Sequence, residues 1–266
     1  MGVAGGHGRR RWPRESFLAR LPEEGRAALL RSGTVLTVPG DHALIREGDP
    51  GRSVYLLLDA LVKVTMCAEN GTRTLLDLRA DGDVVGEMSP LDDRPRSATV
   101  VTCGRSVVCA VKGAVFLAHL DRDPRIARVL GGVAADHLRF ANRRRLAFAG
   151  YEAGVCLARV LLELSDRHGV PRSAGLDVGV PLTQAELGEL VGIKERTVQK
   201  AMRDLVSRGL VLAGHRRVVI ADLAGLAAFA DVRGRPVPER PAPGRPGRDR
   251  LALGGSAPPA GGPAYP

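Results

Sequence analysis

Between residues 34 and 112 the chain is a succession of short Val-, Leu- and Thr-rich runs, and this pattern constrains the fold more than any other feature. The runs are TVLTV, SVYLLL, LVKVTM, RTLLDL, SATVVT and SVVCAV, and turn-forming pairs such as Asn70-Gly71 and Gly82-Asp83 separate them. Short β-branched runs at this spacing predict an antiparallel barrel or sandwich. Asn-Gly between two such runs is a strong signal for a hairpin.

Near residue 114 the period of the pattern becomes helical. Mostly apolar residues then recur every three or four positions, as in a helix that pairs along one face. These residues are Ile126, Leu130, Val133, His137 and Phe140. We expect this seam to join two copies of the chain, because a monomer would leave it exposed.

The stretch LTQAELGELVGIKERTVQKAMRDLVSRGLVL predicts two helices joined by a tight turn. Thr183 and Glu186 have the spacing of a capping box, and Gly192 supplies the turn that ends the first helix. The second helix runs from Lys194 to Arg208 and holds five Lys or Arg and two acids. The following VLAGHRRVVI predicts a basic hairpin. Helix, Gly turn, basic helix and basic hairpin together predict a winged helix-turn-helix, whose second helix enters the DNA major groove.

Side chains that meet DNA must be donors and acceptors rather than hydrocarbon. The candidates are Thr183, Lys194, Glu195, Arg196, Gln199, Lys200, Arg203, Arg216 and Arg217. The alternative is a pair of packed helices with a solvated basic face. The cap, the glycine and the hairpin together favour DNA binding over that alternative.

The segment GEMSPLDDRPRSATV places an acid, Glu87, and a base, Arg96, beside small residues in an irregular loop. A guanidinium with a nest of backbone N–H groups suits a phosphodiester anion, and a carboxylate suits a hydroxyl. The loop therefore predicts either a phosphate-binding site or a surface turn whose charges face water.

Three stretches resemble the cAMP receptor protein (Crp/Fnr) family of bacterial transcription regulators. LIREGDPGRSVYLLLDALVKV is similar to the family's early β-roll signature, and GDVVGEMSPLDDRPRSATV is similar to its phosphate-binding cassette. LTQAELGELVGIKERTVQKAMRDL is similar to its DNA-reading unit. The resemblance implies an α+β fold: an N-terminal cyclic-nucleotide-binding β-roll, a long dimerisation helix and a C-terminal winged helix-turn-helix.

The resemblance also implies which residues bind a cyclic nucleotide, cAMP or cGMP, as an effector rather than a catalytic cofactor. By position, Glu87 accepts a hydrogen bond from the ribose, Arg96 and Ser97 hold the phosphate, and the base lies near Asn142. Gly86 and Ala98 allow the backbone to approach closely. The resemblance implies a homodimer on a pseudo-palindromic operator, with RNA polymerase as a further partner. A different effector, or none, is the alternative.

The chain departs from the family pattern in three respects, one of which is that it lacks an N-terminal Cys cluster, so the iron–sulfur branch of the family is disfavoured. Ala60 stands where the family usually has Gly, and Lys194-Glu195-Arg196 stands where many members have Ser-Arg-Glu. One position along a helix is a rotation of about 100°, so base contacts cannot be copied from relatives and the operator is expected to differ.

Other classes of function have little support in the sequence. No P-loop, nucleophile elbow or paired set of metal ligands is present, so we expect neither an enzyme nor a metal site. The four cysteines have no C-x-x-C spacing and are expected to be thiols. A haem ligand among His119, His137 and His168 is the remaining metal alternative. Without a signal peptide or a long apolar run, we expect a cytoplasmic protein with no membrane contact.

The formal net charge of +10 lies mainly in the tails. Residues 1–16 carry four Arg and one Glu, and the last 34 residues carry six Arg and two acids among many Pro and Gly. Such segments bury too little apolar surface to fold. We therefore expect disorder at 1–16 and 232–266, a β-roll at 17–121, a dimerisation helix and hinge at 122–150, and the winged helix-turn-helix at 151–231.

Overall fold

The computed structural model describes residues 12–232 except residue 72, and at residues 147–149 it describes the backbone only. The tail beyond residue 232 and residues 1–11, both expected to be disordered, lie outside the described residues. Residues 12–16 are described and contact the β-roll. Ser16 is buried, and the indole N–H of Trp12 donates to the Leu58 carbonyl oxygen at 3.5 Å. The β-roll domain thus begins a few residues before the expected boundary at residue 17.

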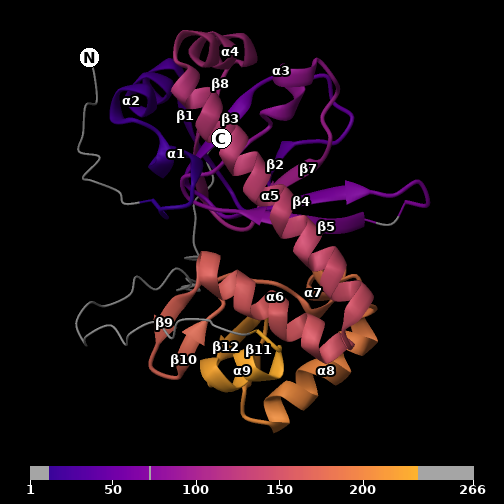
Figure 1. The fold of residues 1–266 in the computed structure, drawn as a ribbon. Coiled ribbons are helices and arrows are strands. Elements are labelled where there is room, and N and C mark those ends of the chain that lie inside the picture. The colour runs from indigo at the N-terminus through magenta and orange to yellow at the C-terminus, as the bar shows by residue number, and fades with distance from the viewer. Residues whose placement is uncertain (1–11, 72, 233–266) are drawn as a thin grey trace, which may run out of the picture. The chain divides into compact units, whose positions relative to one another are not determined.

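The N-terminal half is a β-roll of two four-stranded antiparallel sheets (Figure 1). One sheet has the strand order β1-β8-β3-β6 and the other has the order β2-β7-β4-β5. The strands are β1 (Thr34–Val38), β2 (Ala43–Ile45), β3 (Val54–Asp59), β4 (Val62–Cys67), β5 (Arg73–Arg79), β6 (Val84–Val85), β7 (Thr99–Thr102) and β8 (Ser106–Val111). The six apolar runs correspond to six of these strands, and β4 and β5 form the expected Asn70-Gly71 hairpin.

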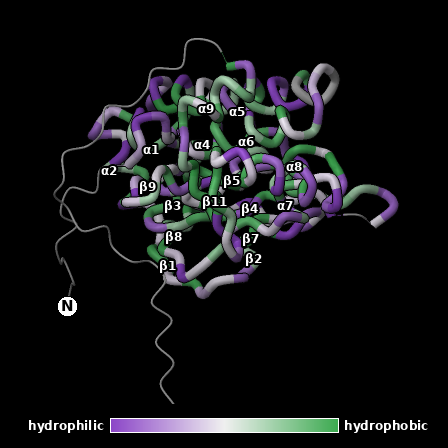
Figure 2. Tube along the Cα trace, turned by 90° about the horizontal axis from the view of Figure 1, so that it is seen from below, coloured by the Kyte–Doolittle hydropathy of each residue, from purple (hydrophilic) through white to green (hydrophobic). Residues whose placement is uncertain are grey.

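Hydrophobic side chains of both sheets meet inside the roll. Figure 2 shows green, hydrophobic trace along β3 and β8, the two strands paired in the middle of one sheet. The interior residues include Ile45, Leu57, Val62, Val85, Val100 and Val108. Each such side chain contributes roughly 1.5–3 kcal/mol when it leaves water, so this core fixes the frame that carries the loops.

Helices cover the outer face of the β3–β8 sheet. They are α1 (Phe17–Arg20), α2 (Glu23–Ser32), α4 (Gly113–Arg122) and the long α5 (Pro124–Gly150), while α3 (Met88–Asp92) is a short helix within the irregular loop. Phe17, Phe116 and Ile126 are fully buried between these helices and the sheet.

The long helix corrects one expectation. Ile126, Leu130 and Val133 are at most 7% exposed and belong to the core of their own β-roll. Phe140 is also buried. The seam predicted to join two copies is therefore packed within one chain, and the prediction that this seam is the dimer contact is wrong. The periodicity correctly predicted a helix with an apolar face, but the core of its own β-roll domain covers that face.

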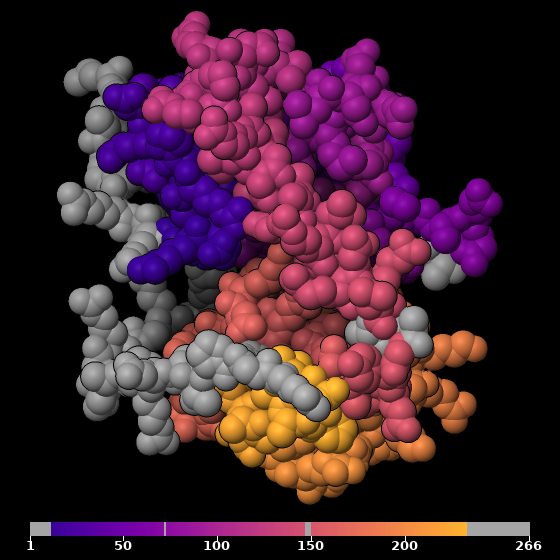
Figure 3. Space-filling view, in the orientation of Figure 1, coloured from indigo at the N-terminus to yellow at the C-terminus, as the bar shows by residue number. Residues whose placement is uncertain are grey.

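A different face of α5 is exposed. Ala127, Gly131, Ala134 and Leu138 follow one another at four- and three-residue steps and are all exposed, Leu138 at 62%. In the space-filling view the first part of α5 forms a band on the surface (Figure 3). A second copy can therefore reach this row of small and apolar side chains.

The C-terminal half is a winged helix-turn-helix. Its elements are α6 (Ala153–His168), β9 (Val170–Arg172), β10 (Gly175–Asp177), α7 (Gln184–Val191), α8 (Glu195–Ser207), β11 (Val211–Gly214), β12 (Arg217–Ile220) and α9 (Leu223–Phe229). The four strands form a sheet in the order β11-β12-β10-β9. The fold class expected from the sequence is thus confirmed. In the described part of the chain, no helix is both long and apolar enough to cross a membrane.

Candidate functional site

The phosphate-binding cassette, defined here as residues 86–98, is shaped by backbone conformation. Gly86 has a positive φ of 81° directly after β6, and Asp93 ends α3 in the left-handed region with φ of 58°. The backbone N–H of Arg96 donates to the Asp49 carbonyl at 2.9 Å, and the Gly48 N–H donates to the Arg96 carbonyl at 2.8 Å. The Gly48-Asp49 turn of the early β-roll signature therefore holds the far end of the cassette in place.

The Arg96 side chain is the central feature of the cassette. It is 6% exposed, and its two terminal nitrogens donate to the carbonyl oxygens of Gly86 at 2.7 Å and Ser53 at 2.6 Å. Burial lowers the pKa of the guanidinium, because water no longer solvates its charge. In the described residues no carboxylate forms an ion pair with it. A buried cation held only by neutral carbonyls attracts an anion.

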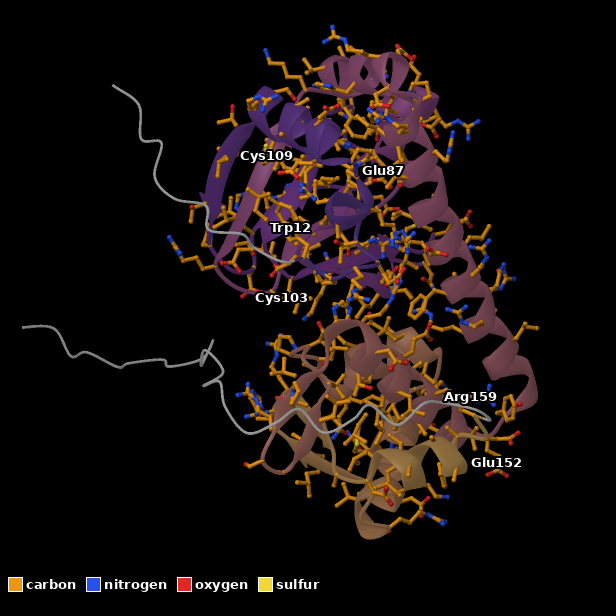
Figure 4. The ribbon with its side chains drawn as sticks, turned by 60° about the vertical axis from the view of Figure 1, so that its left-hand side comes forward. Trp12, Glu87, Cys103, Cys109, Glu152 and Arg159 are labelled. Carbon is orange, nitrogen blue, oxygen red and sulfur yellow. The ribbon has the colours of Figure 1, made fainter. Side chains whose placement is uncertain are left out.

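Glu87 lies within the β-roll (Figure 4). Burial raises the pKa of its carboxyl group, while Arg79 and Arg96 act in the opposite direction through their charges. Glu87 and Arg96 thus influence each other electrostatically without an ion pair between them. An acceptor and a cation therefore remain available side by side for a ligand that carries both a hydroxyl and an anionic group.

The remaining predicted ligand residues divide into two groups. Ser97 is exposed and Ala98 half-buried directly before β7, and the Ser97 hydroxyl contacts only a weak acceptor, the Met88 sulfur at 3.6 Å. Gly86, Glu87, Arg96, Ser97 and Ala98 therefore share one loop system. Asn142 instead lies on the exposed side of α5.

Sequence reasoning missed the role of the segment 51–53. The Ser53 carbonyl accepts from Arg96, and a Cβ at Gly51 would stand 3.8 Å from the Arg96 guanidinium. Every residue has a backbone carbonyl, so the amino-acid sequence could not show that Ser53 is a partner of Arg96. Only the nearby Gly51 indicated that something packs closely against this segment.

We expect Gly86→Ala to destabilise the β-roll by about 1–3 kcal/mol, the usual cost of an L-residue in a strained backbone conformation. The new Cβ would stand 2.7 Å from Ile45 Cδ1 and 2.8 Å from an Arg96 nitrogen, at a positive φ. Gly104→Ala is the matched control, because its added Cβ meets nothing within 4 Å. Urea unfolding midpoints compare the two, and equal midpoints would contradict the steric argument.

The helix-turn-helix begins as the sequence predicted. The Thr183 hydroxyl accepts from the Glu186 N–H at 3.1 Å, and the Glu186 carboxylate accepts from the Thr183 N–H at 2.8 Å. This reciprocal pair confirms the capping box. Gly192 then adopts the left-handed conformation with φ of 65° and ends α7. The Thr183 hydroxyl is therefore already used by the helix cap.

Helix α8 has one buried and one exposed face. Val198, Met202 and Leu205 are buried, as expected. The basic side chains Arg196, Lys200 and Arg203 are exposed, and in the described residues none of them forms an ion pair. Lys194, the N-cap of α8, Glu195 and Gln199 are also exposed.

The two arginines of the predicted wing differ in their surroundings. Arg216 lies at the hairpin turn with φ of 51°, and its guanidinium donates to the Pro181 carbonyl at 3.4 Å. Arg217 donates through Nε to the buried carboxylate of Asp177 at 2.8 Å. Arg217 therefore fixes β12 to β10 and has only part of its guanidinium left for DNA.

The β4–β5 hairpin of the roll contacts α7. Lys63 of β4 forms an ion pair with Glu186, and its side chain is only 13% exposed. The Leu75 N–H of β5 donates to Glu189 at 2.7 Å, and Leu75 belongs to the same hydrophobic core as α7 and α8. Burial alone would raise the pKa of Glu186, but hydrogen bonds from Lys63 and Thr183 hold it below its ordinary value. The same carboxylate thus begins the helix-turn-helix and binds the β-roll.

No group of three His, Cys, Asp or Glu side chains in the described residues is placed to hold a metal ion. The fold and its two sites define a chain with a ligand-binding β-roll followed by a DNA-binding module. Family models agree: the cyclic nucleotide-binding domain matches residues 35–123, and the Crp-like helix-turn-helix domain matches residues 157–229.

The chain belongs to the cAMP receptor protein (Crp/Fnr) family of bacterial transcription regulators. It is 29% identical over 204 residues to a CRP-like cAMP-activated global transcriptional regulator of Mycobacterium tuberculosis, covering 77% of this chain and 91% of that one. It is 28% identical to the cyclic AMP receptor protein of Thermus thermophilus, covering 72% and 86%.

Solved structures show the same fold. A CRP-family transcriptional regulator from Thermus thermophilus has a TM-score of 0.63 at 22% identity, covering 74% of this chain and 96% of that one. The c-di-GMP-responsive regulator CLP of Xanthomonas campestris has a TM-score of 0.66 at 20% identity, covering 76% and 100%.

Proposed function

We propose that this regulator binds a cyclic nucleotide, cAMP or cGMP, in the β-roll and binds a pseudo-palindromic operator as a homodimer when the nucleotide is present. The observation that carries the proposal is the Arg96 guanidinium, buried, held by two neutral carbonyls and without a carboxylate partner in the described residues. The curated relatives named as cAMP-activated or cAMP receptor proteins make cAMP the first ligand to test.

Each cassette residue has a role in this proposal. The remaining donor capacity of Arg96, the Ser97 hydroxyl and nearby backbone N–H groups bind the cyclic phosphate. Glu87 accepts from the ribose 2′-hydroxyl. A hydrogen bond to a charged group contributes roughly 1.5–3 kcal/mol. The phosphate makes several such contacts and the ribose makes one, so the phosphate contacts together supply more affinity. Asn142 contacts the base.

Hydrogen-bonded strands connect the cassette to the helix-turn-helix, which supports coupling between nucleotide binding and DNA binding. Strand β7 begins directly after Ser97-Ala98, and it pairs with β4 so that Val101 lies opposite Lys63. Lys63 in turn binds Glu186 at the start of α7. A shift of the cassette on ligand binding therefore reaches the helix-turn-helix through β7 and β4.

The test combines calorimetry with selection of DNA. A randomised duplex library identifies the preferred operator, and titrations with cAMP and with cGMP then measure nucleotide affinity with and without that operator. We expect heat from at least one nucleotide and an operator affinity that changes by about 5- to 150-fold, with the same factor in both directions. Identical operator affinity with and without nucleotide, and no heat from either, would refute nucleotide control.

We expect Lys63→Met to reduce the coupling between the two sites while nucleotide still binds. The substitution removes the ion pair with Glu186 but leaves the cassette residues unchanged. The ratio of operator affinities with and without nucleotide should fall toward one. Lys112→Met, which changes an exposed lysine at the start of α4, is the control and should keep the ratio. If Lys63→Met kept the wild-type ratio of operator affinities, the coupling would not pass through Lys63.

A further inference from the structure

The exposed face of α8 contains one acidic side chain whose surroundings are unusual. Arg196, Lys200 and Arg203 follow one another at four- and three-residue steps and form a single basic row. Glu195 lies one position earlier, about 100° around the helix, at the edge of that row. The other acid of α8, Asp204, is paired with Arg208 at 2.9 Å.

Glu195 is held by an amide rather than by a cation. The Gln199 Nε2 donates to the Glu195 carboxylate at 3.3 Å across one helical turn. In the described residues no ion pair neutralises Glu195, although Lys194 and Arg196 are its neighbours in sequence. The carboxylate therefore has most of its acceptor capacity left, and the hydrogen bond from Gln199 orients it.

A carboxylate without a cationic partner at this place is unfavourable for non-specific DNA binding. The phosphates repel it, whereas the neighbouring basic row attracts them. It becomes favourable only where it meets a hydrogen-bond donor, and the N-terminal residues of a recognition helix are those that reach base edges. In the major groove, donors are the amino groups of cytosine and adenine.

Cytosine fits the carboxylate better than adenine does. Adenine presents the N7 acceptor beside its N6 donor, so the second carboxylate oxygen would face a lone pair. Cytosine presents only its N4 donor on that edge. The guanine paired with it presents the acceptors O6 and N7, which suit the cation Arg196 or Lys200 of the adjacent row.

We infer that Glu195 selects a cytosine in each operator half-site and that Gln199 positions the Glu195 carboxylate for this contact. The inference rests on the proposed DNA-binding function of α8 and names the base that this function requires. A carboxylate in the first turn of a helix also favours the helix dipole, so the test must separate base selection from helix stability.

The experiment selects from a randomised duplex library with the full chain and saturating nucleotide, comparing the wild type with Glu195→Gln. We expect the wild type to prefer cytosine at one position of each half-site by between about 5- and 150-fold. In Glu195→Gln that preference should be lost at this position alone, while the other positions keep theirs. Gln199→Ala should weaken the same preference only.

Asp204→Asn is the matched control. It removes one negative charge from the same helix, so it should raise affinity for all sequences alike and keep the cytosine preference. Arg196→Ala is a second comparator, since loss of a base contact flattens preference at one base pair, whereas loss of a phosphate contact weakens every sequence equally.

Four outcomes would overturn the inference. Glu195→Gln could retain every base preference of the wild type, or change affinity for all sequences equally, as a helix-stabilising charge would. An adenine at the Glu195-dependent position would refute the choice of cytosine. Wild-type protein that enriches no sequence would refute the proposed function itself, together with this inference, and that result is distinct from the other three comparisons.

Discussion

Arg96→Ala is expected to abolish the response to nucleotide while leaving the protein dimeric and able to bind DNA non-specifically. Removal of the guanidinium eliminates charge-assisted contacts worth roughly 1.5–3 kcal/mol each, so nucleotide affinity should fall at least about tenfold. The nucleotide-dependent rise in operator affinity should disappear. Calorimetry and operator titration measure the two effects. We expect non-specific DNA binding to use the α8 surface, so it should keep its salt dependence in this variant.

Arg94→Ala is the matched control, because it removes an exposed arginine from the same loop. Arg96→Ala also leaves the Gly86 and Ser53 carbonyls without their donors, which destabilises the roll by about 1–3 kcal/mol. Arg96→Lys separates the two effects, since it keeps the charge but loses the planar fork of donors. If a folded Arg96→Ala protein bound the nucleotide with wild-type affinity, the phosphate of the nucleotide would not be bound by Arg96.

Leu138→Asp is expected to convert the proposed homodimer to monomers. Leu138 is 62% exposed in the single chain and follows Gly131 and Ala134 on the outer row of α5. A dimer that covers this row would bury the new carboxylate without a partner, which costs several kcal/mol and weakens dimerisation by more than about 100-fold. Analytical ultracentrifugation at several protein concentrations measures the dimerisation constant directly.

Arg139→Asp, at the next position of α5, is the control for introducing a carboxylate on this helix, and it should stay dimeric. Val133→Asp gives a different result. Val133 is 3% exposed within its own β-roll core, so this variant should unfold the chain rather than separate two folded copies. A Leu138→Asp protein that remains dimeric would exclude the outer row as the interface.

Local features of the sequence predicted local structure well. The capping box at Thr183 and Glu186, the turn at Gly192 and the hairpin at Asn70-Gly71 each depend on residues a few positions apart, so residue type alone determines them. The short strands β2 and β6 were missed, because three or two residues carry no visible alternation.

Features that depend on distant contacts could not be predicted. Periodicity showed that α5 has an apolar face, but a face covered by the core of the same chain has the same pattern as one covered by a partner. Lys63 and Glu186 are 123 positions apart, and neither residue type indicates the other. The carbonyl partners of Arg96 are backbone atoms, which no residue identity encodes. The cassette was therefore predictable as a set of residues, but its support was not.

If Asn142 contacts the nucleotide as proposed, its exposed position makes the concentration of the protein part of the signal. In the proposed homodimer we expect Asn142, on the exposed side of α5, to meet the nucleotide in the roll of the second copy, because the opposite face of α5 packs on its own roll. A complete site then needs two chains, and monomers hold the nucleotide with fewer contacts. By mass action, nucleotide affinity should weaken as the protein is diluted below its dimerisation constant. A cell would then set its sensitivity to nucleotide by how much regulator it makes, as well as by how much nucleotide it contains.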